Sequence, residues 1–239
     1  VLLIASSLAA LIVADSMVGG MRNTMIEGVT HLLSGEAQVH RKGYLETLDA
    51  DLFLPEPDAL LDELAKHPAV QGYAPRAITG GMISSPYNVA GGFLYGVEPE
   101  RERDVSRIAD SLIRGEYLSG ANGELLMGDD LADLLEVDLG DRIVVTVAQV
   151  GGGELSQALF RLSGIVDLGI RELDGAAVFI NLPAAQDALA RGGGVHEIAI
   201  RYADGENSED AAHPLLAHLN ETPAGGPVEA LGWMEFSPS

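Results

Sequence analysis

The sequence contains no cysteine, which excludes disulfide bonds, thiolate zinc sites and cysteine nucleophiles, and leaves the redox compartment undecided. Lysine is nearly absent as well. It occurs only at Lys42 and Lys66, and the formal net charge of the chain is −22. Because such an acidic surface repels phosphate backbones and anionic headgroups, nucleic acid is not an expected partner.

No motif for nucleotide or metal binding is present. A P-loop needs a glycine-rich turn followed by lysine and then serine or threonine, and neither lysine has that setting. The triple glycines at 151–153 and 192–194 lack the strand and helix context of a dinucleotide site, and are typical of turns. None of the histidines forms HExxH, and the spacing of His213 and His218 does not place both on one helical face. We therefore expect no metal site and no cofactor.

Catalytic groups are missing too. The chain has no GxSxG motif, and its serine-containing turns have no identifiable base nearby. Asp129 and Asp130 are neighbours in sequence, and neighbouring side chains on a helix do not face each other, so this pair is not a predicted catalytic dyad. The sequence therefore predicts a protein that is not an enzyme.

The most distinctive feature that is present is an apolar segment, VLLIASSLAALIVA, which has no charge before Asp15. A membrane-spanning helix needs about 20 apolar residues, and a span truncated at its start has this composition. We therefore predict the end of a transmembrane helix. The alternative is the remnant of a signal peptide cleaved after Ala14, although the basic leader of such a peptide is missing.

A methionine stripe follows the apolar segment. Met17, Met21, Met25, Val29 and Leu33 recur every four residues, which predicts that one helix continues to about Leu33. Thioethers can bind soft metal ions, and methionine also makes an adaptable apolar face. Because no histidine or cysteine joins the stripe and Val29 and Leu33 continue it, packing is favoured over copper binding.

The next part of the chain alternates strands and a helix. Strands are expected at 36–44 and 69–77, with a helix from the N-cap Asp58 between them. Two more strands, at 82–89 and 92–97, are expected around a turn at Ala90-Gly91. The alternating charges of PERERD, within 96–118, predict a solvated, ion-paired turn and helix that marks a boundary.

Beyond this boundary the patterns are mostly of β type. They predict strands at 124–127, 143–147, 159–167 and 175–182, with short helices ending at Leu135 and Arg191. Strand and then helix character returns after Glu197. Because hydrophobic residues make up 47% of the 239 residues, a sizeable core is expected. We predict an α+β fold in which the chain leaves one subdomain, builds a second and returns.

Several stretches together resemble the periplasmic core domain of FtsX-like ABC transporter permeases of the MacB and LolC/LolE type. They include GMRNTMIE, HPAVQGYAPR, YGVEPERERDVSRI, LLMGDDLADLLEVDLGDRIVV and GWMEFSP, in the family's order. The resemblance implies a Porter-like α/β subdomain split around an inserted, mainly-β Sabre-like subdomain. The implied division is 1–34 for the end of the first transmembrane helix and its periplasmic extension, 35–105 and 195–239 for the Porter-like parts, and 106–194 for the Sabre-like part.

The resemblance also implies a function. Such a domain lies on the periplasmic side of a bacterial inner membrane and works with a separate ATP-binding subunit and a second permease subunit, in a homodimer or a heterodimer. A periplasmic adaptor or a lipoprotein is a further implied partner. The permease would couple cytoplasmic ATP hydrolysis to release or export of a lipoprotein or other apolar substrate by mechanotransmission. Met17, Met21, Met25 and Val29 would then either line the exit path or pack against the domain's own helices or the partner subunit.

One departure from the family pattern concerns carrier recruitment. Permeases of the LolC type have a longer, proline-containing loop between two Sabre strands, whereas 148–158 here reads AQVGGGELSQA without proline. This departure favours LolE-like or MacB-like behaviour. Two other functions stay open: a signalling permease that regulates a cell-wall hydrolase or senses antimicrobial peptides, and a secreted binding domain that begins at Asp15.

Overall fold

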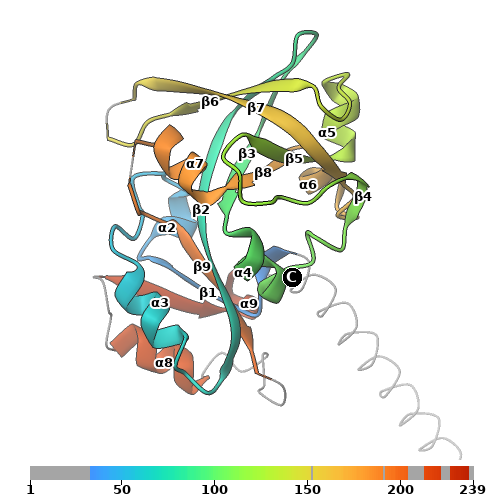
Figure 1. Cartoon of the computed structure of the whole chain (residues 1–239). Coiled ribbons are helices and arrows are strands. Elements are labelled where there is room, and N and C mark those ends of the chain that lie inside the picture. Colours follow the sequence, from blue (N-terminus) through green and yellow to red (C-terminus); the bar gives the residue numbers. More distant parts are fainter. Residues whose placement is uncertain (1–32, 152, 191, 204–212, 222–226, 237–239) are drawn as a thin grey trace, which may run out of the picture.

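The structure is a computed structural model that describes residues 33–239 except 152, 191, 204–212, 222–226 and 237–239 (Figure 1). Its strands are β1 (Ala37–Arg41), β2 (Val70–Ser84), β3 (Val89–Val97), β4 (Leu112–Gly115), β5 (Glu124–Gly128), β6 (Arg142–Ala148), β7 (Leu155–Val166), β8 (Ala177–Asn181), β9 (Glu197–Tyr202) and β10 (Val228–Gly232). Its helices are α2 (Tyr44–Thr47), α3 (Asp58–Leu64), α4 (Pro99–Val105), α5 (Asp129–Leu134), α6 (Arg171–Asp174), α7 (Leu182–Ala188), α8 (Pro214–Glu221) and α9 (Trp233–Phe236).

All of these strands belong to one sheet, part of which closes on itself. The strand order is β10-β1-β9-β2-β3-β8-β5-β7-β4, and β6 pairs with both β2 and β7. The strands β2, β3, β8, β5, β7 and β6 therefore form a closed ring, a small barrel. From β2 the sheet continues with β9, β1 and β10, which lie at the end of the molecule away from the barrel. There α3 and α8 lie side by side (Figure 1).

The core occupies both faces of the barrel wall. Val178 and Ile180 of β8 point into the larger hydrophobic cluster, whereas Ala177 and Phe179 pack into a second cluster on the other face. Every residue of β8 is buried, which explains the continuous apolar run AVFI that precedes Asn181. β6 alternates instead, with Ile143, Val145 and Val147 buried and the residues between them partly exposed.

The strand pairing shows that the chain returns to the first part of the sheet after it has built the barrel. β9 lies between β1 and β2, and β10 pairs with β1. The barrel also uses β2 and β3, which precede the predicted boundary at 105–106. The division into Porter-like and Sabre-like subdomains, with the boundaries given above, stays a prediction.

Two local predictions are wrong. The hairpin turn lies at 85–88 and not at Ala90-Gly91, because the Ser85 hydroxyl accepts the N–H groups of Tyr87 and Asn88 and stabilises the turn there. Ala90 and Gly91 pair inside the β2–β3 ladder. Asp58 is the first residue of α3 and not its N-cap, because the helix already begins with the Leu61 N–H bonded to the Pro57 carbonyl oxygen.

No helix among the described residues is long and apolar enough to cross a membrane. The predicted end of a transmembrane helix and its extension up to residue 32 lie outside the described residues.

Candidate functional site

Three charged side chains are buried together where β2, α4 and β9 meet, and we call them the ion triad. Arg76 of β2 donates from Nε and Nη2 to the two carboxylate oxygens of Glu102 on α4, at 3.1 and 2.6 Å. Its Nη1 donates to Glu197 Oε1 on β9, at 2.6 Å. Arg76 is 1% exposed and Glu102 is fully buried. The Arg76–Glu102 contact therefore has the bidentate geometry of the stronger charge-assisted pairs.

Backbone geometry brings the triad together. Arg76 and Glu197 lie opposite each other in the antiparallel β2–β9 ladder. Helix α4 lies directly on β2 because residue 72 is glycine: a Cβ there would come within 2.9 Å of the Asp104 Cβ. The prediction of a solvated PERERD segment is thus wrong for Glu102, since α4 turns this residue inward while Glu100 stays exposed.

A row of polar groups leads from the first described residues toward the triad. The Gln38 amide nitrogen donates to the carbonyl oxygen of Ser34, and its amide oxygen lies 2.9 Å from His40 Nε2. His40 Nδ1 lies 3.3 Å from the His196 carbonyl oxygen. The His196 N–H in turn donates to the Arg76 carbonyl oxygen. Because a neutral His40 has one ring proton and both of its nitrogens face oxygens, it donates in only one of these two contacts at a time.

The tautomer of His196 follows from its partners. The Ile78 N–H donates to His196 Nδ1 at 3.0 Å, so this nitrogen has no proton. Nε2 then holds the proton and donates to the Ala50 carbonyl oxygen, also at 3.0 Å. A second proton on Nδ1 would break the bond from Ile78. The neutral ring thus joins β2 to the loop that contains Ala50.

Burial lowers the pKa of both histidines below the ordinary value of 6.5. For His40, the carboxylates of Glu197 and Glu229 raise the pKa but do not outweigh burial. For His196, the bond to the Ala50 carbonyl oxygen and the charge of Glu197 also raise the pKa, and burial outweighs them again. Both rings are therefore neutral at pH 7.

A cavity of about 240 Å³ lies beside the triad. Its lining includes Leu33 and Ser34, Tyr44 and Leu48 from the segment after β1, Phe93 and Tyr95 from β3, and Arg76 and Glu197 of the triad. Burial and the nearby charge of Glu197 raise the pKa of Tyr95 to about 12. The same two causes raise the pKa of Tyr44, so both phenols stay protonated in the physiological range.

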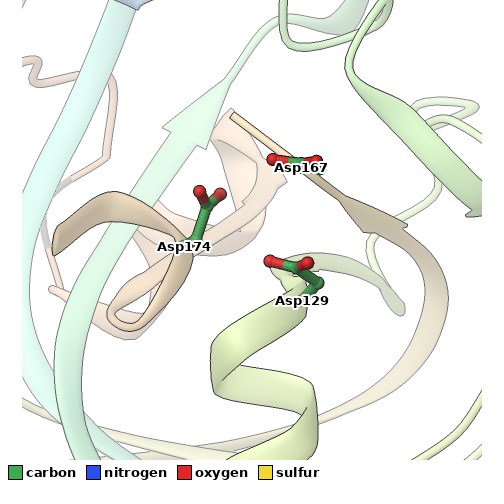
Figure 2. A group of neighbouring side chains, drawn as sticks. All are labelled: Asp129, Asp167 and Asp174. Atoms are coloured by element: carbon green, nitrogen blue, oxygen red, sulfur yellow. The ribbon is translucent and has the colours of Figure 1, made fainter. Parts of the chain in front are cut away.

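A second group of charges, on the barrel, consists of Asp129, Asp167 and Asp174, whose carboxylate oxygens lie within 4.8 Å of one another (Figure 2). Asp174 is buried and accepts the Leu168 N–H at 2.8 Å. Burial raises its pKa, and the charges of Asp129 and Asp167 raise it further. Carboxylates are ligands of hard cations, but nothing else in the described residues indicates a ligand here. Sequence reasoning missed the group because its members are distant in sequence.

The predicted site residues Met17, Met21, Met25 and Val29 lie outside the described residues, so their role stays a prediction. Of the stripe, only Leu33 is described. It is 9% exposed, packs in the cluster that contains Phe179, and lines the cavity. The structure thus places the end of the stripe next to the triad, which no motif in the sequence indicated.

Two solved structures have a fold similar to that of this chain. The periplasmic region of MacB from Actinobacillus actinomycetemcomitans matches with a TM-score of 0.58 and 14% identity, over 87% of this chain and 94% of that chain. The extracellular domain of the ABC-type transporter YknZ from Gram-positive bacteria matches with a TM-score of 0.53 and 12% identity, over 83% of this chain and 100% of that chain. At these identities the likeness shows the fold alone, and it confirms the predicted mixed α and β architecture.

Sequence comparison identifies the family. The model of the MacB-like periplasmic core domain matches residues 1–217. This chain therefore belongs to the family of MacB-like periplasmic core domains, which confirms the resemblance found in its sequence. It is also similar to the lipoprotein-releasing system transmembrane protein LolC of Xylella fastidiosa strains 9a5c and Temecula1, with 28% identity over 172 residues. The match covers 70% of this chain and 40% of LolC, so the chain spans less than half the length of these relatives.

The triad predicts unequal effects for two glutamates of one helix. Glu102→Gln replaces the bidentate carboxylate with an amide that accepts at one oxygen only, while Glu197 still pairs with Arg76, and should lower the free energy of unfolding by about 1–3 kcal/mol. Glu100→Gln, on the exposed side of α4, should change it by less than about 0.5 kcal/mol. Urea denaturation of both variants measures the difference. Equal losses would show that the triad does not stabilise the fold.

The two histidines predict a pH dependence of stability. Because the pKa of each is lower in the folded state than the ordinary 6.5, their contribution is complete above that pH and is lost as the pH falls through 6.5 toward the folded-state values. In His196→Asn, the amide oxygen can still accept the Ile78 N–H but cannot be protonated. Thermal unfolding between pH 8 and pH 5 should give a melting temperature that falls less steeply for this variant than for the wild type. An equally steep fall of the melting temperature in the variant and the wild type would contradict the neutral state assigned to His196.

Proposed function

We propose that this chain is the extracytoplasmic domain of an ABC transporter permease, on the periplasmic side of a bacterial inner membrane. It couples ATP hydrolysis by a separate ATP-binding subunit to release or export of a lipoprotein or other apolar substrate. A second permease subunit, identical or homologous, completes the assembly. Family membership supports the transporter class, and the similarity to a lipoprotein-releasing protein supports the cargo.

The observation on which the proposal rests is how the start of the described chain enters the sheet. The Glu36 N–H donates to the Ile200 carbonyl oxygen at 2.9 Å, and the Glu36 carbonyl oxygen accepts the Trp233 N–H at 3.1 Å. The Glu36 carboxylate also accepts the Tyr202 N–H at 2.7 Å. We call residues 33–36 the junction. Its hydrogen bonds join it to β9 and to the start of α9.

Packing around Gly35 makes the junction tight. Gly35 has φ +73°, and a Cβ there would lie 2.9 Å from the Ile200 carbonyl oxygen, so no other residue fits without strain. The Gln38 amide nitrogen also donates to the carbonyl oxygen of Ser34, the residue before Gly35. A movement of the segment before Leu33 would therefore be passed to β1 and β9, and through the ion triad to β2 and the barrel. This is the mechanical connection that mechanotransmission requires.

The loop between β6 and β7 bears on the choice among family members. It spans only the residues between Ala148 and Leu155, and the Gln149 N–H donates to the Glu154 carbonyl oxygen across it. So short a hairpin offers little surface for a soluble carrier. We propose a release mechanism without carrier recruitment by this loop, although the curated relatives that match are LolC proteins.

Co-purification tests the transporter assignment. The full-length gene, expressed with its neighbouring reading frames and purified in detergent, should retain a nucleotide-binding ATPase in stoichiometric amount. An accompanying adaptor or lipoprotein would favour transport. A cell-wall hydrolase or a sensor kinase in its place would favour the signalling alternative, and a water-soluble protein beginning at Asp15 without an ATPase would contradict the proposal.

Two glycine variants test the coupling itself. Gly35→Ala combines a positive φ with a clash against β9, whereas Gly43→Ala has a similar φ of +85° and no atom within 4 Å. In the reconstituted permease complex, Gly35→Ala should lower substrate release by about tenfold while basal ATP hydrolysis stays within about twofold, because the junction loosens. Gly43→Ala should leave both rates near wild type. The same loss in both variants would mean that backbone strain, and not the junction, is responsible.

A further inference from the structure

The cavity beside the ion triad has an unbalanced charge at its floor. The bidentate Arg76–Glu102 pair is neutral, and Glu197 adds a further carboxylate, so one guanidinium and two carboxylates leave a net charge of −1. The neighbouring His40 does not balance this charge, because burial lowers its pKa and keeps the ring neutral. Arg76 is the one side chain that donates to the Glu197 carboxylate among the described residues. An anion is therefore disfavoured in the cavity and a cation is favoured.

The walls are aromatic. Tyr44, Phe93 and Tyr95 line the cavity together with the aliphatic side chain of Leu48. Two of the rings are held in place by other rings: Tyr44 stacks on His40 with centroids 5.3 Å apart, and Tyr95 stacks on Phe179 at the same distance. Aromatic faces attract alkylammonium groups, most strongly where the cation is shielded from water. Fixed rings around a buried carboxylate are thus suited to an ammonium group.

The rim of the cavity opens onto an apolar surface. Leu48 is 60% exposed and Phe93 is 45% exposed. From Phe93 and its partner Gly80, the apolar surface continues to Met82 on β2, whose row then continues with the polar side chains of Thr146 and Gln157; Leu159 lies beyond them on β7. The pairing places no charged residue on this face until Arg142 and Arg161 at its far edge, in a chain of net charge −22. A short hydrocarbon chain that leaves the cavity can lie over Leu48, Phe93 and Met82.

Leu48 itself has an unusual backbone. Its φ of +50° lies in the left-handed region, which a leucine rarely adopts. The Leu48 N–H donates to the Tyr44 carbonyl oxygen at 2.7 Å and closes the turn. A left-handed residue commonly ends a helix, as Leu48 ends α2, and glycine is the residue that fits this position with least strain.

We propose that the cavity binds the ammonium group of a cationic amphiphile, with Glu197 as counter-ion and Tyr44, Phe93 and Tyr95 around the head group. The hydrocarbon chain of the amphiphile lies over Leu48 and Phe93 and continues along the outer face of β2 and β3. The binding site does not depend on the proposed coupling role, because binding is a property of this chain alone.

Calorimetric titration of the 239-residue chain in a maltoside detergent tests the proposal. The probes are hexyltrimethylammonium, hexyl sulfate and tetramethylammonium, each also titrated into detergent without protein. Hexyltrimethylammonium should bind saturably and at least about tenfold more tightly than hexyl sulfate, because the two differ mainly in the sign of the charge. Tetramethylammonium should bind more weakly than hexyltrimethylammonium, because it lacks the apolar chain.

Variants locate the site. Glu197→Gln should weaken hexyltrimethylammonium binding by about tenfold, and Phe93→Ala by about three- to tenfold. Leu48→Gly removes the apolar side chain but suits the left-handed backbone, so binding should fall without a loss of thermal stability. Leu159→Ala, 58% exposed on the same face beyond the cavity, is the matched control and should change affinity by less than about twofold.

Three results would overturn the proposal. Equal affinity for the ammonium and the sulfate probe would show that the cavity does not select charge. Equal losses for Leu159→Ala and Phe93→Ala would show unspecific adsorption to the apolar face. If Glu197→Gln does not fold, unchanged binding in both Leu48→Gly and Phe93→Ala would by itself overturn the proposal. Both positions are exposed, so these two variants should fold.

Discussion

The structure depends on the buried pairing of Arg76 with Glu102 and Glu197. A charge that is shielded from water is strongly unfavourable unless it is paired, so each of the two carboxylates requires Arg76 to stay in place. Because the groups belong to β2, α4 and β9, the pairing fixes how these elements sit relative to one another. Between Arg76 and Glu197 the chain forms the other five strands of the barrel, so the triad also determines where the chain re-enters the sheet after leaving it.

Strand β2 transmits this constraint. It contributes Arg76 in its middle, pairs with β9 on the side of the triad, and then continues to Ser84 as a wall of the barrel. The junction at residues 33–36 is bonded to β9 from the other side. A path of paired backbone and buried polar groups therefore runs from the first described residues to the barrel. The cavity lies along this path, so a bound ligand would contact both the junction and the triad.

The local periodicity of apolar residues along the sequence predicted most of the fold. The alternation of Ile143, Val145 and Val147 located β6, and the apolar run of β8 was found because such runs are typical of strands buried on both faces. The four-residue helices α2, α6 and α9 were missed, because one helical turn has too few positions for a period. The site itself could not be predicted. Glu102 looks like any member of a charged run, and only tertiary packing turns it toward Arg76. The family resemblance supplied the class of protein, but none of its motifs contains the pairing of Arg76 with Glu197 or the cavity.

The most direct test of this account is hydrogen exchange at the amide of Glu36, compared with the amides of β1 and β9 in the same sample. If the junction is a rigid part of the sheet, Glu36 should be as strongly protected as the strand amides, because its bond to the Ile200 carbonyl oxygen would open only when the sheet itself opens. If Glu36 exchanges as fast as a frayed terminus while β1 and β9 stay protected, the junction opens locally. The start of the chain could then not transmit a movement to the barrel, and the central claim would be wrong.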